Sequence, residues 1–115
     1  MKVKIYHNPR CRKSREGLRL LEGSHLDFEI IDYLKNPPSE KELYDILTML
    51  GFKPIQLVRK NESIWKENYK NRELTDDEIV KAMCDNPKLI ERPIVIKGNK
   101  AVLGRPPDNI LVLLK

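Results

Sequence analysis

The sequence predicts an α/β fold in which a mixed parallel and antiparallel sheet is flanked by helices. Short β-branched runs stand near both ends of the chain, and segments with helical periodicity lie between them. The order is β-α-β, then helices, then β-β-α, which closes naturally as a sheet covered by helices. The 115 residues fit one domain, predicted over residues 1–115 with a helical insert at approximately 37–88.

The first third predicts a β-α-β unit. A strand around Ile5 ends near His7, and the dipeptide Asn8-Pro9 indicates a turn. A helix is expected from Cys11 to about Glu22, and the run DFEIIDY favours a second strand. Two strands joined by a helix form a parallel pair.

The middle of the chain predicts helices. One helix opens near Ser39 and closes at Gly51, and its apolar residues share one face: Leu43, Ile46, Leu47 and Leu50. Residues 52–72 favour short helical turns. The run Thr75-Asp76-Asp77-Glu78 is a capping box that opens another helix, which ends near Asn86.

The last third predicts a β-hairpin and a closing helix. The run PIVI at 93–96 favours a buried strand, and Gly98-Asn99 favours a tight turn before a returning strand at 101–103. A final helix is expected from Pro107 to Leu114. Its sheet-facing residues are predicted to be Ile110, Leu111 and Leu114.

Charge is concentrated near the start of the chain. The net charge is +5, but residues 1–20 alone carry +6 and the remainder carries −1. Such a local positive field attracts anions and favours a thiolate. No basic surface interleaved with aromatic residues indicates nucleic-acid binding, and no apolar run is long enough for a membrane span or signal peptide. We therefore expect a cytoplasmic protein with no nucleic-acid or membrane partner.

The two cysteines, Cys11 and Cys84, are too few for a disulfide framework, and neither lies in a C-x-x-C pair. Together with His7 and His25 they show no metal-ligand spacing, so no metal site is expected. Cys84 lies near the end of an apolar-faced helix. There it is either a small packed residue, the favoured interpretation, or a resolving thiol for Cys11.

Cys11 is the candidate nucleophile. It begins a helix, where free backbone N–H groups and the helix dipole stabilise an anion and lower a thiol pKa. The hydroxyl of Ser14 could donate a hydrogen bond to the sulfur, and His7 could polarise the site. Three neighbouring cations are expected to lower the pKa further: Arg10, Arg12 and Lys13.

Arg92-Pro93 marks a second candidate element of the site. A proline can open a strand, or it can form a cis peptide in a tight turn before it. Either arrangement holds Arg92 extended, where its guanidinium could bind an oxyanion through two hydrogen bonds. Arg59 and Arg105 are further candidates, although composition alone favours a surface charge for each.

Four motifs together resemble one family. The run HNPRCRKSREGLRLLE resembles the active-site segment of the glutaredoxin-coupled arsenate reductases, which have a thioredoxin-like fold. The segments LVRKNE, LTDDEIVKAMCDNPKLIERPIVI and VLGRPPDNIL are similar to further motifs of that family. They occur in family order and cover nearly the whole chain.

This resemblance implies roles for individual residues. Cys11 matches the nucleophile, Ser14 the serine that tunes it, and His7 the histidine ahead of it. Pro93 matches the cis-proline opposite the active site. Three arginines match those that bind the arsenate oxyanion: Arg59, Arg92 and Arg105.

The resemblance also implies a reaction. The thiolate attacks arsenate and forms a covalent adduct, glutathione attacks next, and glutaredoxin completes the turnover with release of arsenite. No bound cofactor or metal is needed, and a monomer is expected. The chain departs from the best-known members at Arg12 and Lys13, where those have small neutral residues.

Two alternatives belong to other functional classes. Spx-type regulators share the fold and bind RNA polymerase, but their redox switch uses C-x-x-C where this chain has Cys11-x-x-Ser14. A monothiol redox module acting on mixed disulfides would suit Cys-x-x-Ser, but it would leave the three matched arginines without a role.

Overall fold

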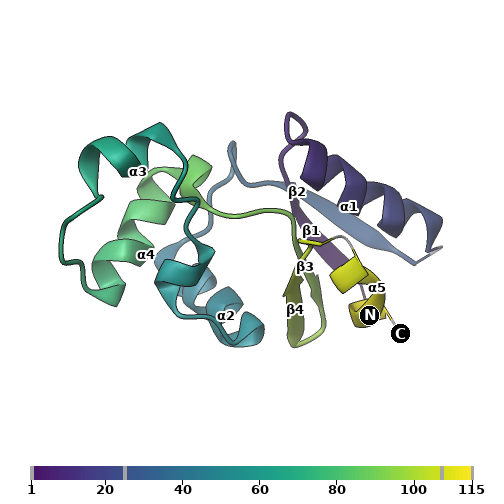
Figure 1. Ribbon diagram of the computed structural model, residues 1–115. Coiled ribbons are helices and arrows are strands. Elements are labelled where there is room, and N and C mark those ends of the chain that lie inside the picture. Colours follow the sequence, from purple (N-terminus) through teal and green to yellow (C-terminus); the bar gives the residue numbers. More distant parts are fainter. Residues whose placement is uncertain (1, 25, 107, 115) are drawn as a thin grey trace. The chain divides into compact units, whose positions relative to one another are not determined.

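The computed structural model describes residues 2–24, 26–106 and 108–114 (Figure 1). The chain forms two compact units. One comprises Met1–Asn36 with Arg92–Lys115, and the other comprises Pro37–Glu91. Within the described ranges, no helix is long and apolar enough to cross a bilayer.

The first unit contains a four-stranded sheet in the order β2-β1-β3-β4. Its elements are β1 Val3–His7, α1 Arg12–Gly23, β2 Phe28–Asp32, β3 Ile94–Lys97, β4 Lys100–Leu103 and α5 Asp108–Leu114. Strand β1 is parallel to β2 and antiparallel to β3, and β3 is antiparallel to β4. The predicted α/β class with a mixed sheet and flanking helices is confirmed.

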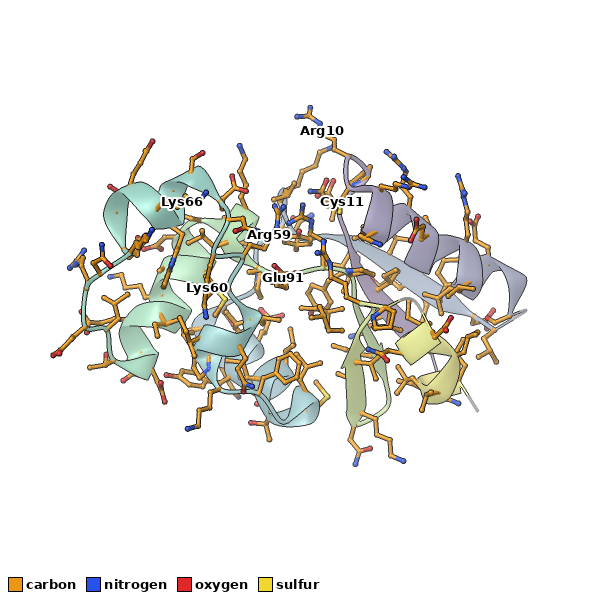
Figure 2. All side chains as sticks on the ribbon, in the orientation of Figure 1. Arg10, Cys11, Arg59, Lys60, Lys66 and Glu91 are labelled. Atoms are coloured by element: carbon orange, nitrogen blue, oxygen red, sulfur yellow. The ribbon has the colours of Figure 1, made fainter. Side chains whose placement is uncertain are left out.

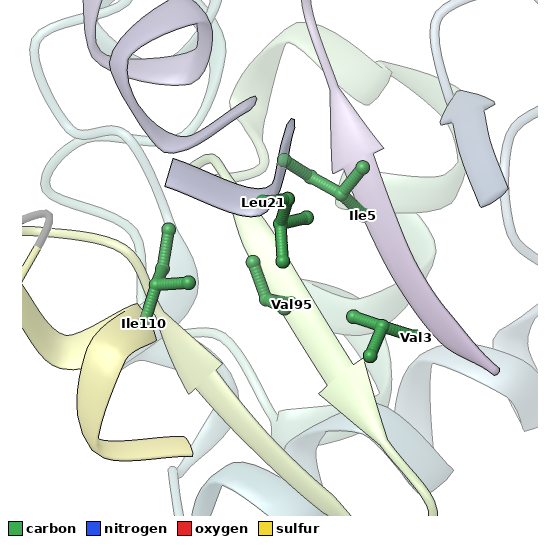
Figure 3. Packing of buried hydrophobic residues seen from close by; sticks show 5 residues of the cluster. All are labelled: Val3, Ile5, Leu21, Val95 and Ile110. Atoms are coloured by element: carbon green, nitrogen blue, oxygen red, sulfur yellow. The ribbon is translucent and has the colours of Figure 1, made fainter. Parts of the chain in front are cut away.

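The core of this unit lies between the sheet and helices α1 and α5. Five side chains at 0% exposure form it, from β1, α1, β3 and α5 (Figure 3): Val3, Ile5, Leu21, Val95 and Ile110. Because β1 alternates its side chains between the two sheet faces, Val3 and Ile5 meet the helices together. This packing fixes α1 against β1, and with it the turn that carries Cys11.

Helix α5 differs from its prediction in one residue. Ile110 is fully buried and Leu114 packs against the core, but Leu111 is 43% exposed. The predicted burial of Leu111 is therefore wrong. Positions 110, 113 and 114 share one helix face, whereas 111 is turned about 100° from 110, and Leu113 packs against the core in its place. Pro107, the predicted start of this helix, lies outside the described residues.

The second unit is helical. Its elements are α2 Glu40–Leu50, the 3₁₀ helix η1 Pro54–Leu57, α3 Ser63–Asn68, α4 Asp76–Asp85 and the 3₁₀ helix η2 Pro87–Leu89. Both predicted helix starts are confirmed as capping boxes, one from Ser39 to Glu42 and one from Thr75 to Glu78. Helix α2 ends at Gly51, whose φ of 71° is readily adopted by glycine.

Helices α2 and α4 pack together and form the interior of the second unit. The buried residues on their facing sides are Leu43, Ile46, Leu47, Ile79, Val80 and Met83. An isolated bridge joins Val58 to Ile90. Next to it, the N–H of Arg59 donates to Leu89 O at 2.7 Å, which fixes the backbone that carries the Arg59 side chain.

Two glycines allow close packing around Pro93 in the first unit. A Cβ atom on Gly17 would lie 2.8 Å from Pro93 Cγ and 2.9 Å from Ile110 Cδ1. A Cβ on Gly104 would meet the same two atoms at the same distances. The N–H of Gly104 also donates to Pro93 O at 2.8 Å. Pro93 is thus packed against α1 and against the segment that precedes Arg105.

We expect Gly17→Ala to destabilise the protein by about 1–3 kcal/mol, the usual cost of overpacking a well-filled core. Gly23→Ala, in the same helix, is the matched control because nothing lies within 4 Å of its Cβ position. Urea unfolding measures both free energies. Equal stability of the two variants would contradict the packing role of Gly17.

Candidate active site

Cys11 is the N-cap residue of α1, with extended backbone angles (φ −98°, ψ 122°) (Figure 2). Asn8 organises the turn before it. Asn8 O accepts from the N–H of Cys11 at 3.0 Å, and Asn8 Oδ1 accepts from the N–H of Arg10 at 3.0 Å. The sulfur therefore lies beside the free N–H groups of the first helical turn, as the sequence predicts.

Ser14 is fully buried and connects the helix to the end of β1. Its Oγ lies 2.7 Å from His7 Nδ1 and accepts from the N–H of Asn8 at 2.9 Å. These are not the partners that the sequence predicted, since the hydroxyl was expected to donate to the sulfur. The Ser14 backbone N–H instead forms the hydrogen bond with Cys11. Ser14 thus helps the thiolate through its backbone and fixes the loop through its side chain.

His7 is 5% exposed at the end of β1. Burial lowers its pKa from 6.5, and the charge of Arg15 acts in the same direction. The interaction with Ser14 and the charge of Asp32, its partner in β2, oppose this without reversing it. The imidazole is therefore mainly neutral at pH 7, which suits an exchange of one hydrogen bond with the Ser14 hydroxyl.

Arg92 and Arg105 are brought to Cys11 from the segments before β3 and after β4. The Nη2 of Arg105 lies 3.8 Å from the Cys11 sulfur, and its Nε donates to Arg92 O at 2.8 Å. Arg92 is 6% exposed and forms a hydrogen bond with Cys11. Both arginines precede prolines in cis peptide bonds, so the cis alternative considered for Pro93 is the one observed.

The guanidinium of Arg92 has unused hydrogen-bonding capacity. Its Nε and Nη1 are buried, and neither has a hydrogen-bond partner among residues 2–24, 26–106 and 108–114. Buried donors are costly to leave unpaired, and most in folded proteins are satisfied. Two such donors on one guanidinium, beside a cysteine, form a fork that matches two oxygens of an oxyanion.

The pKa of Cys11 is lowered from its ordinary value. Burial raises it, but four contributions outweigh burial: the N–H of Ser14, the charge of Arg92, the hydrogen bond from Arg92 and the N–H of Lys13. The sequence correctly located the helix N-terminus. It expected the positive charge that lowers this pKa to come from sequence neighbours of Cys11. The charge that lowers it instead belongs to Arg92, which is distant in the sequence.

We expect the rate of iodoacetamide alkylation of Cys11 to have its pH midpoint below that of a free cysteine, about 8.5. The midpoint reports the thiolate, which these contacts stabilise. Cys84→Ser leaves Cys11 as the single thiol and isolates its profile. A midpoint at or above the free value would contradict the proposed stabilisation.

Cys84 has the opposite environment. Burial raises its pKa to about 11, and the carboxylates of Glu40, Asp85 and Glu42 add to the shift. A thiol in this environment is a poor nucleophile near neutral pH. The packed-residue interpretation of Cys84 is therefore better supported than a role as a resolving thiol.

Arg59 belongs to the second unit and is half-buried there (Figure 2). Its Nη1 lies 3.1 Å from Glu62 Oε2, and its Nε lies 3.9 Å from Glu91 Oε1. These carboxylates hold the guanidinium in place. Its role in oxyanion binding remains a prediction.

In the described part of the chain, no group of three His, Cys, Asp or Glu residues could hold a metal ion. The site instead combines a stabilised thiolate, backbone N–H donors and two guanidinium groups. Such a set can bind a tetrahedral oxyanion and attack its central atom. Sequence reasoning missed the roles of Asn8 and Asp32. The Asn-Pro turn was the available signal for Asn8, whereas the position of Asp32 beside His7 follows only from the register between β1 and β2.

Comparisons with known proteins agree with this geometry. The YfgD protein of Escherichia coli K12 is 45% identical over 97% of this chain and 96% of its own length. The arsenate reductase of Haemophilus influenzae is 44% identical over 99% of this chain and 100% of its own length. The solved structure of the Vibrio cholerae arsenate reductase superimposes with a TM-score of 0.92 at 44% identity, covering 97% of both chains.

The family description agrees with these relatives and with the thioredoxin-like fold expected from the resemblance. The ArsC family matches residues 6–113, which include the Cys11 turn, Arg92, Arg105 and the whole helical unit. The chain therefore belongs to the ArsC family.

Proposed function

We propose that the protein reduces arsenate to arsenite, with Cys11 as nucleophile and with glutathione and glutaredoxin as reductants. The proposal rests chiefly on one observation. A cysteine whose pKa is lowered lies beside Arg105 and a buried Arg92, two of whose donors have no partner within the described ranges. A simple disulfide exchange needs the thiolate but not the guanidinium forks, whereas an oxyanion substrate needs both.

The proposed reaction begins with oxyanion binding. Arg92 and Arg105 hold the arsenate oxygens, and the Cys11 thiolate attacks arsenic. An arsenic–sulfur bond forms and one oxygen leaves as water after protonation. Arsenic remains pentavalent in this adduct, so the step needs no reductant.

Two thiols then supply the electrons. The glutathione thiol replaces a second oxygen, which leaves as water with the thiol proton. A glutaredoxin thiolate attacks the glutathione sulfur, the sulfur–arsenic electron pair stays on arsenic, and a mixed disulfide leaves. Water then replaces Cys11 on trivalent arsenic and releases arsenite. In total, arsenate and two thiols give arsenite, one disulfide and one water.

The direct test is arsenite production by the purified protein with arsenate, glutathione and glutaredoxin. We expect turnover that requires all three, and we expect Cys84→Ser to retain most of it because Cys84 has a raised pKa. Reduction of a glutathionylated peptide without arsenate turnover would favour the monothiol redox module. RNA polymerase binding without either activity would favour the Spx-like alternative.

A further inference from the structure

The exposed side of α1 carries cations that the oxyanion site does not use. Arg12, Arg15 and Arg19 are three and four residues apart, so they follow one another along one side of the helix. Together with Glu16 they line a polar hollow of about 300 Å³. We call these four residues the α1 row.

The side chains of the α1 row are partly ordered by local contacts. Arg15 Nη1 donates to Pro9 O at 3.1 Å, which ties it to the turn before Cys11. Arg12 Nε lies 3.3 Å from Glu16 Oε1, but the Arg12 side chain is 84% exposed. Exposed ion pairs of this kind contribute little to stability, so a charged ligand can compete for both the guanidinium and the carboxylate.

The α1 row begins in the helical turn that carries the nucleophile. The N–H of Arg15 donates to Cys11 O at 3.0 Å, and Arg19 lies one turn further on. At a rise of 1.5 Å per residue, the row from Arg12 to Arg19 is about 10 Å long. A molecule lying along it could therefore have one end close to the sulfur.

We propose that the α1 row binds the tripeptide thiol that attacks the Cys11 adduct, and this inference rests on the proposed function. Glutathione carries two carboxylates and one ammonium, which match the arginines and Glu16. An extended tripeptide also spans about 10 Å. Its bound thiol would form the sulfur–arsenic bond while an arsenic-bound oxygen leaves as water with the thiol proton.

The position of Glu16 distinguishes a tripeptide from a wholly acidic partner. A carboxylate in the middle of a cationic row repels an acidic protein surface, but it pairs with an ammonium group.

The test is calorimetric binding of S-methylglutathione, whose blocked thiol prevents turnover. We expect Arg19→Gln to weaken binding about fivefold or more through loss of a charge-assisted contact. Glu16→Gln is expected to weaken it as well, although that change makes the surface more positive. Lys4→Gln is the matched control: it removes one exposed charge from the same unit outside the row, and binding should not change.

Three results would overturn the proposal: no binding to the unmodified protein, equal weakening by Lys4→Gln, or tighter binding by Glu16→Gln. The last would indicate a general anion surface. Because binding is measured without arsenate, its outcome can be told apart from the outcome of the arsenite assay. Arsenite production without tripeptide binding would refute only the α1 row, whereas binding without arsenite production would refute only the reductase activity.

Discussion

Cys11→Ser is expected to abolish arsenite formation, with a loss of roughly a thousandfold or more, as for other removed nucleophiles. A serine hydroxyl is not ionised near pH 7, so the N–H groups and Arg92 that stabilise the thiolate have no anionic nucleophile to act on. Arsenite formation with glutathione and glutaredoxin, measured in parallel with the unmodified protein, gives the loss directly.

Cys84→Ser is the matched control for this prediction, because it makes the same chemical change at the other cysteine of the sequence. Sulfate binding by the Cys11→Ser protein shows separately that the arginines are still in place. Equal loss in both variants would indicate a two-cysteine mechanism. Retained turnover in Cys11→Ser would remove Cys11 from the reaction altogether.

Arg92→Ala is expected to weaken arsenate or sulfate binding by about 2–5 kcal/mol, the range for losing one partner of a buried, hydrogen-bonded charge pair. Arg92 is 6% exposed, and two of its buried donors have no partner in the described part of the chain, so bulk water would not replace its contacts with an oxyanion. Calorimetric titration with either anion measures the effect.

Two further variants separate charge, geometry and folding in this result. Arg92→Lys keeps the charge but loses the planar fork, and we expect intermediate affinity. Arg72→Ala, at an exposed arginine of the second unit, should leave binding unchanged. Arg92→Ala should also raise the pKa of Cys11, because the Arg92 charge lowers it. Unchanged affinity together with an unchanged thiol pKa would contradict the assigned role.

Local sequence signals predicted most of the fold. The capping boxes at Ser39 and Thr75 use side chains three residues from their partners, so the helix starts were visible without tertiary information. The parallel pairing of β1 with β2 followed from the helix between them. Leu111 was misplaced because a seven-residue helix contains several apolar residues, and packing decides which face is buried.

The chemistry of the site was only partly visible in the sequence. The position of Cys11 at a helix start is a local feature, and it was predicted from the turn that precedes it. The pairing of Ser14 with His7 depends on how α1 docks on β1, and the contact of Arg105 with Cys11 joins residues 94 positions apart. The residue pattern had suggested Arg92 as an oxyanion ligand, with Arg59 and Arg105 as further candidates, and the family resemblance then implied the same role for all three.

The unpaired donors of Arg92 have a consequence for folding itself. Burying a cation whose N–H groups find no partner among the residues that the structure describes costs folding free energy, since the unfolded chain exposes the same groups to water. An anion that binds only the folded state adds stability in proportion to the logarithm of its concentration. Melting temperature should therefore increase with the concentration of a bound oxyanion, so that the thermal transition itself reports how fully the site is occupied.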